Sequence, residues 1–159
     1  MIKYHKKDLL VPIDSPYFIR KGANDKHNEL TLVVVKYAFP VNAALLGGAY
    51  ALNPVAMQFI SKAVSGFQGI QLQFNKNPQA PAFVFTIKAK TERRGNDVHN
   101  QELADKIVLC KANIKASTVA KKILEGMLNY CNFAAQSALA VKNIFEDFIA
   151  RETKYMSNM

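Results

Sequence analysis

The sequence contains no Asp or Glu between Leu30 and Thr91, although the chain has 12 acidic residues in all. Five lysines do occur in this stretch, namely Lys36, Lys62, Lys76, Lys88 and Lys90. A surface built from it therefore has no carboxylate of its own to repel a phosphate. Over the whole chain, 21 Lys and Arg give a formal net charge of +9, which favours nucleic acid, an anionic membrane surface or an acidic protein as partner.

Cysteine is scarce, and long uninterrupted apolar runs are absent. Cys110 and Cys131 show no CxxC or Cys/His metal spacing, and both fall at positions expected to be apolar, which predicts buried free thiols in a reducing compartment. Segment 1–7 is charged and lacks the apolar core of a secretory signal. Pro, Gly and Asn interrupt the most apolar segment, 37–64, so it does not form a spanning helix of about 20 residues. We expect a cytoplasmic location.

Motifs for catalysis are also missing. No Ser-His-Asp or Cys-His arrangement, phosphate-binding loop or dinucleotide fingerprint is present. The polar segment 92–105 contains Asp97, His99, Glu102 and Asp105, which are residue types that bind divalent metals or transfer protons. It has no recognised ligand spacing, so a solvated loop is the favoured interpretation. We expect a protein that is not an enzyme and that uses no cofactor, metal or small-molecule substrate.

The order of strand and helix patterns is typical of an α+β fold. Alternating or β-branched segments predict strands at 16–20, 30–39, 70–75, 82–91 and 106–116. Asn53 and Pro54 predict the start of a short helix, and Gly66 its end. We expect one domain over residues 1–159, with an antiparallel sheet, one short mid-chain helix and one long C-terminal amphipathic helix. The order also fits two βββα-like halves; segment 41–52 is ambiguous.

The long helix is predicted over 118–153, with Ser117 or Thr118 as its cap. At roughly 50 Å it would exceed the width of a domain whose radius of gyration is about 15 Å. The excess length predicts that the far half meets another subunit, because heptad spacing permits a helix–helix seam. The alternative is a helix that packs only on its own sheet. The predicted oligomer interface comprises Met127, Ala134, Val141, Ile144 and Phe148.

Two of the predicted strands carry lysines on one face and apolar residues on the other. Lys88 and Lys90 alternate with apolar residues in 82–91, and Lys111 and Lys115 do so in 106–116. If these strands pair, four lysines stand together, and same-face lysines two residues apart in a strand lie roughly 7 Å apart. This spacing is close to that of phosphates along an extended single strand.

Three further cations extend the predicted surface. Lys36 joins it if its strand is a neighbour, and Arg93 with Arg94 form a guanidinium pair able to grip phosphate or stack on bases. Single-strand binders usually place aromatic residues among their cations, whereas Phe83 and Phe85 fall on the inward face. The aromatic residues left as candidates for stacking are Tyr37, Tyr50 and Phe67.

The expected function is binding of nucleic acid, preferably single-stranded DNA or RNA, by a homo-oligomer with little sequence specificity. The first alternative is a solvated strand face whose lysines only protect the sheet. The second is a structural or assembly protein, for example a phage or virion component. The third is a small regulatory protein that binds an acidic partner surface.

Overall fold

The computed structural model describes residues 9–23, 28–40, 53–67, 69–75, 82–93 and 100–159. The segment 41–52 lies outside them. The predicted α+β class, with an antiparallel sheet, one short helix and one long C-terminal helix, is confirmed. The elements in chain order are β1 (Val11–Pro12), β2 (Tyr17–Lys21), β3 (Glu29–Pro40), α3 (Pro54–Val64), β4 (Gln73–Asn75), β5 (Ala82–Arg93) and α4 (Gln101–Ser157).

The long strand β3 is central in the sheet, as its apolar character on both faces predicts. One edge of β3 pairs with β2 and β1, and the other pairs with β5 along its whole length, in register from Glu29 with Arg93 to Pro40 with Ala82. The short strand β4 pairs with β5 only from Ala82 to Val84. Among the described residues, the outer edge of β5 therefore has no partner strand from Phe85 onward.

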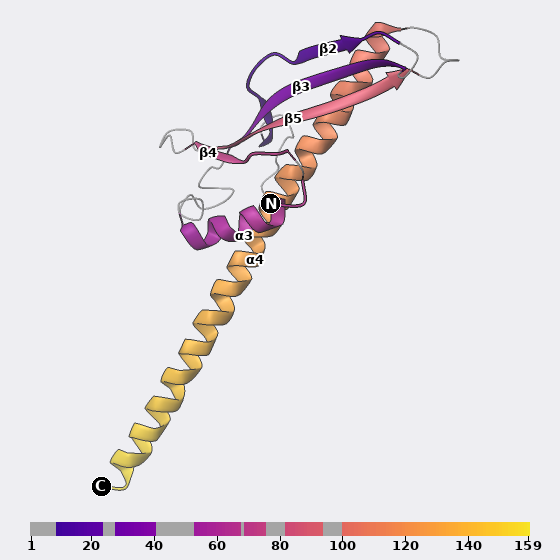
Figure 1. Ribbon diagram of the computed structural model, residues 1–159. Coiled ribbons are helices and arrows are strands. Elements are labelled where there is room, and N and C mark those ends of the chain that lie inside the picture. The colour runs from indigo at the N-terminus through magenta and orange to yellow at the C-terminus, as the bar shows by residue number, and fades with distance from the viewer. Residues whose placement is uncertain (1–8, 24–27, 41–52, 68, 76–81, 94–99) are drawn as a thin grey trace.

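The core lies between one face of the sheet and the near half of α4, which crosses that face diagonally (Figure 1). Tyr37 on β3 is 2% exposed, stacks on Phe85 of β5 and donates a 2.7 Å hydrogen bond from its hydroxyl to Asn113 Oδ1 on α4. Burial raises the pKa of this phenol. The core side chains of α4 follow helical spacing: Val108, Ala112, Ala116, Val119, Ile123 and Met127.

The short helix α3 begins where the sequence predicts and packs against α4. The Asn53 side chain accepts hydrogen bonds from the Val55 and Ala56 amides and donates one of 2.8 Å to the Tyr130 hydroxyl on α4. The two helices cross closely at Gly126, where an added Cβ would lie 2.7 Å from the Ile60 Cα. Glycine is required here by this backbone contact.

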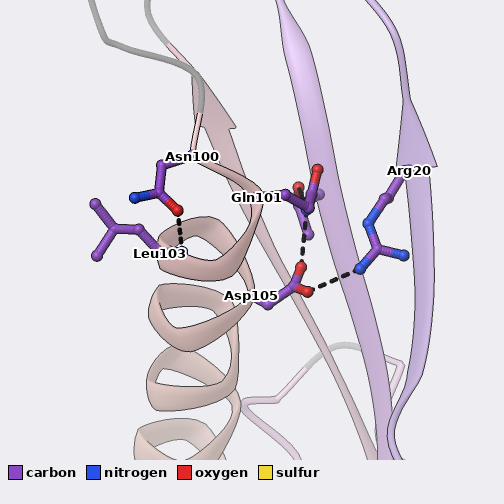
Figure 2. A network of polar contacts seen from close by, with 6 residues as sticks. Arg20, Asn100, Gln101, Leu103 and Asp105 are labelled. Carbon is purple, nitrogen blue, oxygen red and sulfur yellow. Dashed lines mark hydrogen bonds and ion pairs between the residues drawn. The ribbon is translucent and has the colours of Figure 1, made fainter.

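Polar contacts hold the start of α4 against the sheet. Gln101 donates from Nε2 to Thr31 Oγ1 of β3 and to Asp105 Oδ1, and Asp105 also pairs with Arg20 of β2 at 2.8 Å. Figure 2 shows this network beside the Asn100 cap, whose side chain accepts a hydrogen bond from the Leu103 amide. Part of the segment expected to be a solvated loop is therefore ordered helix fixed to two strands.

The strand predicted at 106–116 is wrong, because this segment is part of α4. The alternation of apolar residues there also contains a helical repeat through Val108 and Ala112, which are buried, while Cys110 and Ile114 are exposed. Thr118 does not cap a helix; its hydroxyl donates to the Ile114 carbonyl one turn back inside α4. The second half of the chain consequently has two described strands, β4 and β5, before its helix.

The far half of α4 extends beyond the sheet and α3, as Figure 1 shows. The helix spans 57 residues, so it is about 85 Å long. Its last buried residue is Met127, and residues 135–159 are all exposed. Within the described part of the chain, no helix is both long and apolar enough to cross a membrane.

Candidate nucleic-acid interface

Four of the predicted lysines do come together, although two of them lie on a helix. Lys88 and Lys90 are exposed on β5, and Lys111 and Lys115 are exposed one turn apart on α4. Lys111 Nζ donates a 3.2 Å hydrogen bond to the Lys90 carbonyl, and Lys115 Nζ donates one of 2.9 Å to the Lys88 carbonyl. We refer to Lys88, Lys90, Lys111 and Lys115 as the lysine edge.

The lysine edge arises because four residues of a helix rise about as far as two residues of a strand. Alternate carbonyls of a strand point to the same edge about 6.6 Å apart, and one helical turn of four residues rises about 6 Å. The helix α4 runs antiparallel to β5 here, so Lys111 reaches Lys90 and Lys115 reaches Lys88. Each ammonium thus covers an edge carbonyl of β5 that no described strand uses.

The described part of the chain shows no ion pair between the lysine edge and a carboxylate. In the described ranges, the ion pairs involve other cations, such as Arg20 with Asp105 and Lys106 with Glu102. A backbone carbonyl is neutral and occupies one of the three N–H donors of an ammonium. Lys111 and Lys115 therefore have N–H donors left for an anion.

Two carboxylates farther along α4, Glu125 and Glu146, pair with neighbouring lysines. Lys122 donates a hydrogen bond to Glu125 at 2.9 Å and, with a weaker contribution from Lys121, holds the pKa of the Glu125 carboxyl below its usual value. Lys142 pairs with Glu146 at 3.0 Å. These pairs lie toward the C-terminus from Lys115, and none of the ion pairs of the described residues involves Lys111 or Lys115.

Two hollows lie along the lysine edge and contain apolar surface. One of about 280 Å³ is lined by Ala89, Lys90, Lys111, Ile114 and Lys115. Lys115 also lines a second hollow of about 390 Å³, whose other lining residues are Gly66, Phe67, Gly69, Ile70, Thr86, Ile87 and Lys88. Cationic side chains thus border both hollows, and an aromatic ring lies in one of them.

The three aromatic candidates for base stacking have different positions. Phe67 is half-buried in the hollow beside Lys88 and Lys115. Tyr37 is buried in the core and has no access to a ligand. Tyr50 lies outside the described residues. Of the described candidates for base stacking, Phe67 is therefore the one that lies beside the lysine edge.

Lys36 extends the positive surface onto the open face of the sheet. It is exposed on β3, opposite Thr86 in the register, while Val34 lies opposite Lys88. Lys36 and Lys88 are therefore diagonal neighbours on the face away from α4, with their Cβ atoms roughly 7–8 Å apart. The prediction that Lys36 has a neighbouring strand with lysines agrees with this register.

Of the two arginines predicted to join this surface, Arg93 pairs with a carboxylate instead. Arg93 donates from Nε to Glu29 Oε2 at 2.9 Å, so its charge faces a carboxylate at the C-terminal end of β5, three residues beyond Lys90. Arg94 lies outside the described residues. The hollow near Arg93, about 440 Å³, is also lined by Glu29 and Glu92, which makes it unfavourable for phosphate.

Sequence reasoning missed the carbonyl contacts and the hollows, because it treated 106–116 as a strand. The spacing of Lys111 and Lys115, four residues apart without a Gly or Pro between 101 and 125, was the available signal for a helix. In the described ranges, no cluster of His, Cys, Asp or Glu is suited to a metal ion. Comparison with protein-family models, curated proteins and solved structures gives no match to this chain.

Proposed function

We propose that this chain binds single-stranded nucleic acid, DNA or RNA, along the lysine edge with little sequence preference. The observation that supports the proposal is the set of four exposed ammonium groups, which have no described carboxylate partner and border two partly apolar hollows. Phosphates would contact the lysines, and Phe67 would contact a base or sugar. Contacts of this kind give affinity without reading the sequence.

The spacing of the lysines fits a flexible strand better than a duplex. Successive cations lie roughly 6–7 Å apart along both β5 and α4, close to the distance between phosphates in an extended single strand. The hollows are small and lie beside the edge of one strand, whereas a duplex presents a broad rigid surface. A single strand can follow the edge with its phosphates toward the lysines and its bases toward Phe67 and Ile114.

Salt dependence provides the first test of the proposal. Full-length protein is titrated with labelled single- and double-stranded oligonucleotides, DNA and RNA, at rising salt concentration. Four to five phosphate contacts to a single strand predict a slope of about −3 in log K against log salt. The proposal is rejected if no oligonucleotide binds at low salt, or if binding is insensitive to salt.

A matched pair of variants separates the lysine edge from net charge. Changing Lys88, Lys90, Lys111 and Lys115 to Ala should reduce affinity by about a hundredfold. The control changes Lys106, Lys121, Lys122 and Lys142 to Ala; each of these lysines pairs with a carboxylate, and the variant loses the same charge. Equal losses in both variants would show that binding follows net charge alone, which would contradict the proposed site.

An assembly role is the second candidate function, and the far half of α4 favours it. Large apolar side chains that include Val141, Ile144, Phe145 and Phe148 are at least half exposed there. Exposed apolar surface of this extent is typical of protein–protein contact. If the oligonucleotide titrations are negative while the chain associates with itself, the assembly role becomes the better explanation.

A further inference from the structure

The apolar stripe of α4 continues past the core without changing direction. Val119, Ile123 and Met127 are buried against the sheet and α3. At 3.6 residues per turn, Val141 and Phe148 fall on the same side of the helix as these residues. The side chains of the continued stripe are between 50% and 67% exposed: Val141, Ile144, Phe145, Phe148, Ile149, Tyr155 and Met156.

The charges of this region do not favour a polyanion or an anionic membrane as its partner. Residues 131–157 contain three cations and three carboxylates, so their net charge is zero. Surface-bound amphipathic helices usually carry an excess of Lys and Arg on the polar face. The stripe itself contains one charged residue, Glu152. An apolar stripe with a single charged residue fits another helix of the same character.

We propose that residues 134–155 pair with the same residues of a second copy of the chain, and that the two helices run antiparallel. The near part of the stripe consists of small residues, Cys131, Ala134, Ser137 and Ala138. The far part consists of large ones, including Phe145, Phe148, Ile149, Tyr155 and Met156. Antiparallel pairing places large side chains against small ones, which fills space at constant helix separation.

Parallel pairing fits the same stripe poorly. It would place each residue next to its own copy, so Ala134 and Ala138 would leave space while Phe145 and Phe148 would crowd. It would also place Glu152 against Glu152, and like charges at a helix seam are destabilising. In the antiparallel register, Glu152 lies opposite Ser137, whose hydroxyl can donate a hydrogen bond to the carboxylate.

The position of α3 sets the register. Phe59 of α3 contacts the rings of Tyr130 and Phe133 on α4, so α3 occupies the helix surface up to that point. A partner helix can lie on α4 only beyond it, which leaves 134–155 as the available segment. The centre of this segment lies between Ile144 and Phe145, and the symmetry axis of the dimer would pass there.

The contact is large enough for a stable dimer. Each of the six large exposed side chains of the stripe within 134–155 would lose about 100 Å² of accessible surface. Two copies then bury roughly 1,200 Å², which is at the lower end of the range of stable protein–protein interfaces. The overlap is about 30 Å long.

The mass of the full-length chain in solution tests the pairing, independently of any binding to nucleic acid. Light scattering or sedimentation should show a dimer. Phe148→Asp should give a monomer, whereas the control Leu139→Asp should remain a dimer, because Leu139 is equally exposed but lies off the stripe. A monomeric wild type, a larger assembly, or equal effects of the two variants would each overturn the proposal.

The orientation is tested with a spin label at a single cysteine. Cys110 and Cys131 are changed to Ser, and Met156 is changed to Cys and labelled. Antiparallel pairing predicts a distance between the two labels of about 35 Å, and parallel pairing predicts about 10 Å. The short distance would overturn the antiparallel arrangement. In a second experiment the label is placed at Ile144→Cys. The proposed register predicts a short distance between the two labels, and a long distance would overturn it.

Discussion

Lys115 Nζ donates a 2.9 Å hydrogen bond to the backbone carbonyl of Lys88, which connects α4 to the outer edge of β5. The contact brings a cationic side chain to the backbone of a residue that is itself cationic, and the described residues show no ion pair of either lysine with a carboxylate. Like charges that approach each other repel, so such an arrangement is unfavourable unless an anion binds or solvent screens the charges. The carbonyl dipoles of Lys88 and Lys90 offset part of that repulsion, because their oxygens face the Lys115 and Lys111 ammonium groups.

Replacing only the helical pair tests whether its charge or its carbonyl contacts matter. Lys111→Ala with Lys115→Ala should lower affinity for single-stranded oligonucleotides about tenfold, since two phosphate contacts are lost. Lys111→Arg with Lys115→Arg should retain the affinity. Titration of each double variant at one low salt concentration measures both effects. Loss of affinity in the Arg variant as well would show that the lysines act through shape and not through charge.

Gly126→Ala should destabilise the fold through the contact between α3 and α4. The added Cβ would lie 2.7 Å from the Ile60 Cα and 2.9 Å from the Phe59 carbonyl oxygen, so the two helices would have to separate. Overpacking of this kind costs about 1–3 kcal/mol. Against this cost stands a gain of about 1 kcal/mol in helix propensity when Gly is replaced by Ala. Denaturant unfolding measures the change, and a more stable variant would contradict the close crossing.

Tyr37→Phe should remove a contact that holds β3 to α4. The Asn113 Oδ1 atom would lose its 2.7 Å donor, and the free energy of unfolding should fall by about 1–2 kcal/mol at neutral pH. Burial raises the pKa of this phenol above its ordinary value of 10.0, so its contribution is complete below pH 10 and declines as the pH rises through the folded-state pKa.

Tyr37→Phe also tests how the stability of the fold depends on pH. The difference in unfolding free energy between wild type and Tyr37→Phe should shrink above pH 10, because only the wild type has this buried phenol to ionise. Chemical denaturation at pH 7 and at several alkaline values measures the difference. A constant difference at all pH values would show that Tyr37 does not titrate with unfolding.

Asn53→Ala should weaken the start of α3. The side chain of Asn53 accepts from two amides of the first turn and donates to the Tyr130 hydroxyl, and all three contacts would be lost. A lost N-cap costs about 1 kcal/mol. Asn53→Ser is the control, because Ser restores the cap acceptor but is too short for the Tyr130 contact. Thermal unfolding should rank the wild type above Asn53→Ser and Asn53→Ala lowest.

Much of the fold was predictable because local signals agree with the tertiary contacts. The alternation from Phe83 to Lys90 predicts which side chains of β5 face the core, and Asn53 with Pro54 marks the start of α3; the structure confirms both. Each signal depends on backbone geometry over a few residues. The predicted lysine positions on β5 were therefore correct.

The segment 106–116 was mispredicted because its sequence satisfies two repeats. Apolar residues at 108, 110, 112 and 114 alternate as in a strand, while 108, 112 and 116 recur as in a helix. The sheet selects the helical pattern, since Ala112 and Ala116 let α4 approach β3 and β5 closely. The choice between helix and strand is decided by packing against β3 and β5, whose residues are distant in the sequence. The residues near position 110 alone therefore do not predict it.

Because α4 is continuous from Gln101 to Ser157, one rigid rod carries both the apolar stripe and the helical half of the lysine edge, Lys111 and Lys115. A single inserted residue anywhere between Phe133 and Val141 would rotate everything beyond it by about 100° and advance it by about 1.5 Å. The number of residues in α4 therefore sets both the distance and the angle between the two surfaces. Evolution can lengthen the rod by whole turns more easily than by single residues.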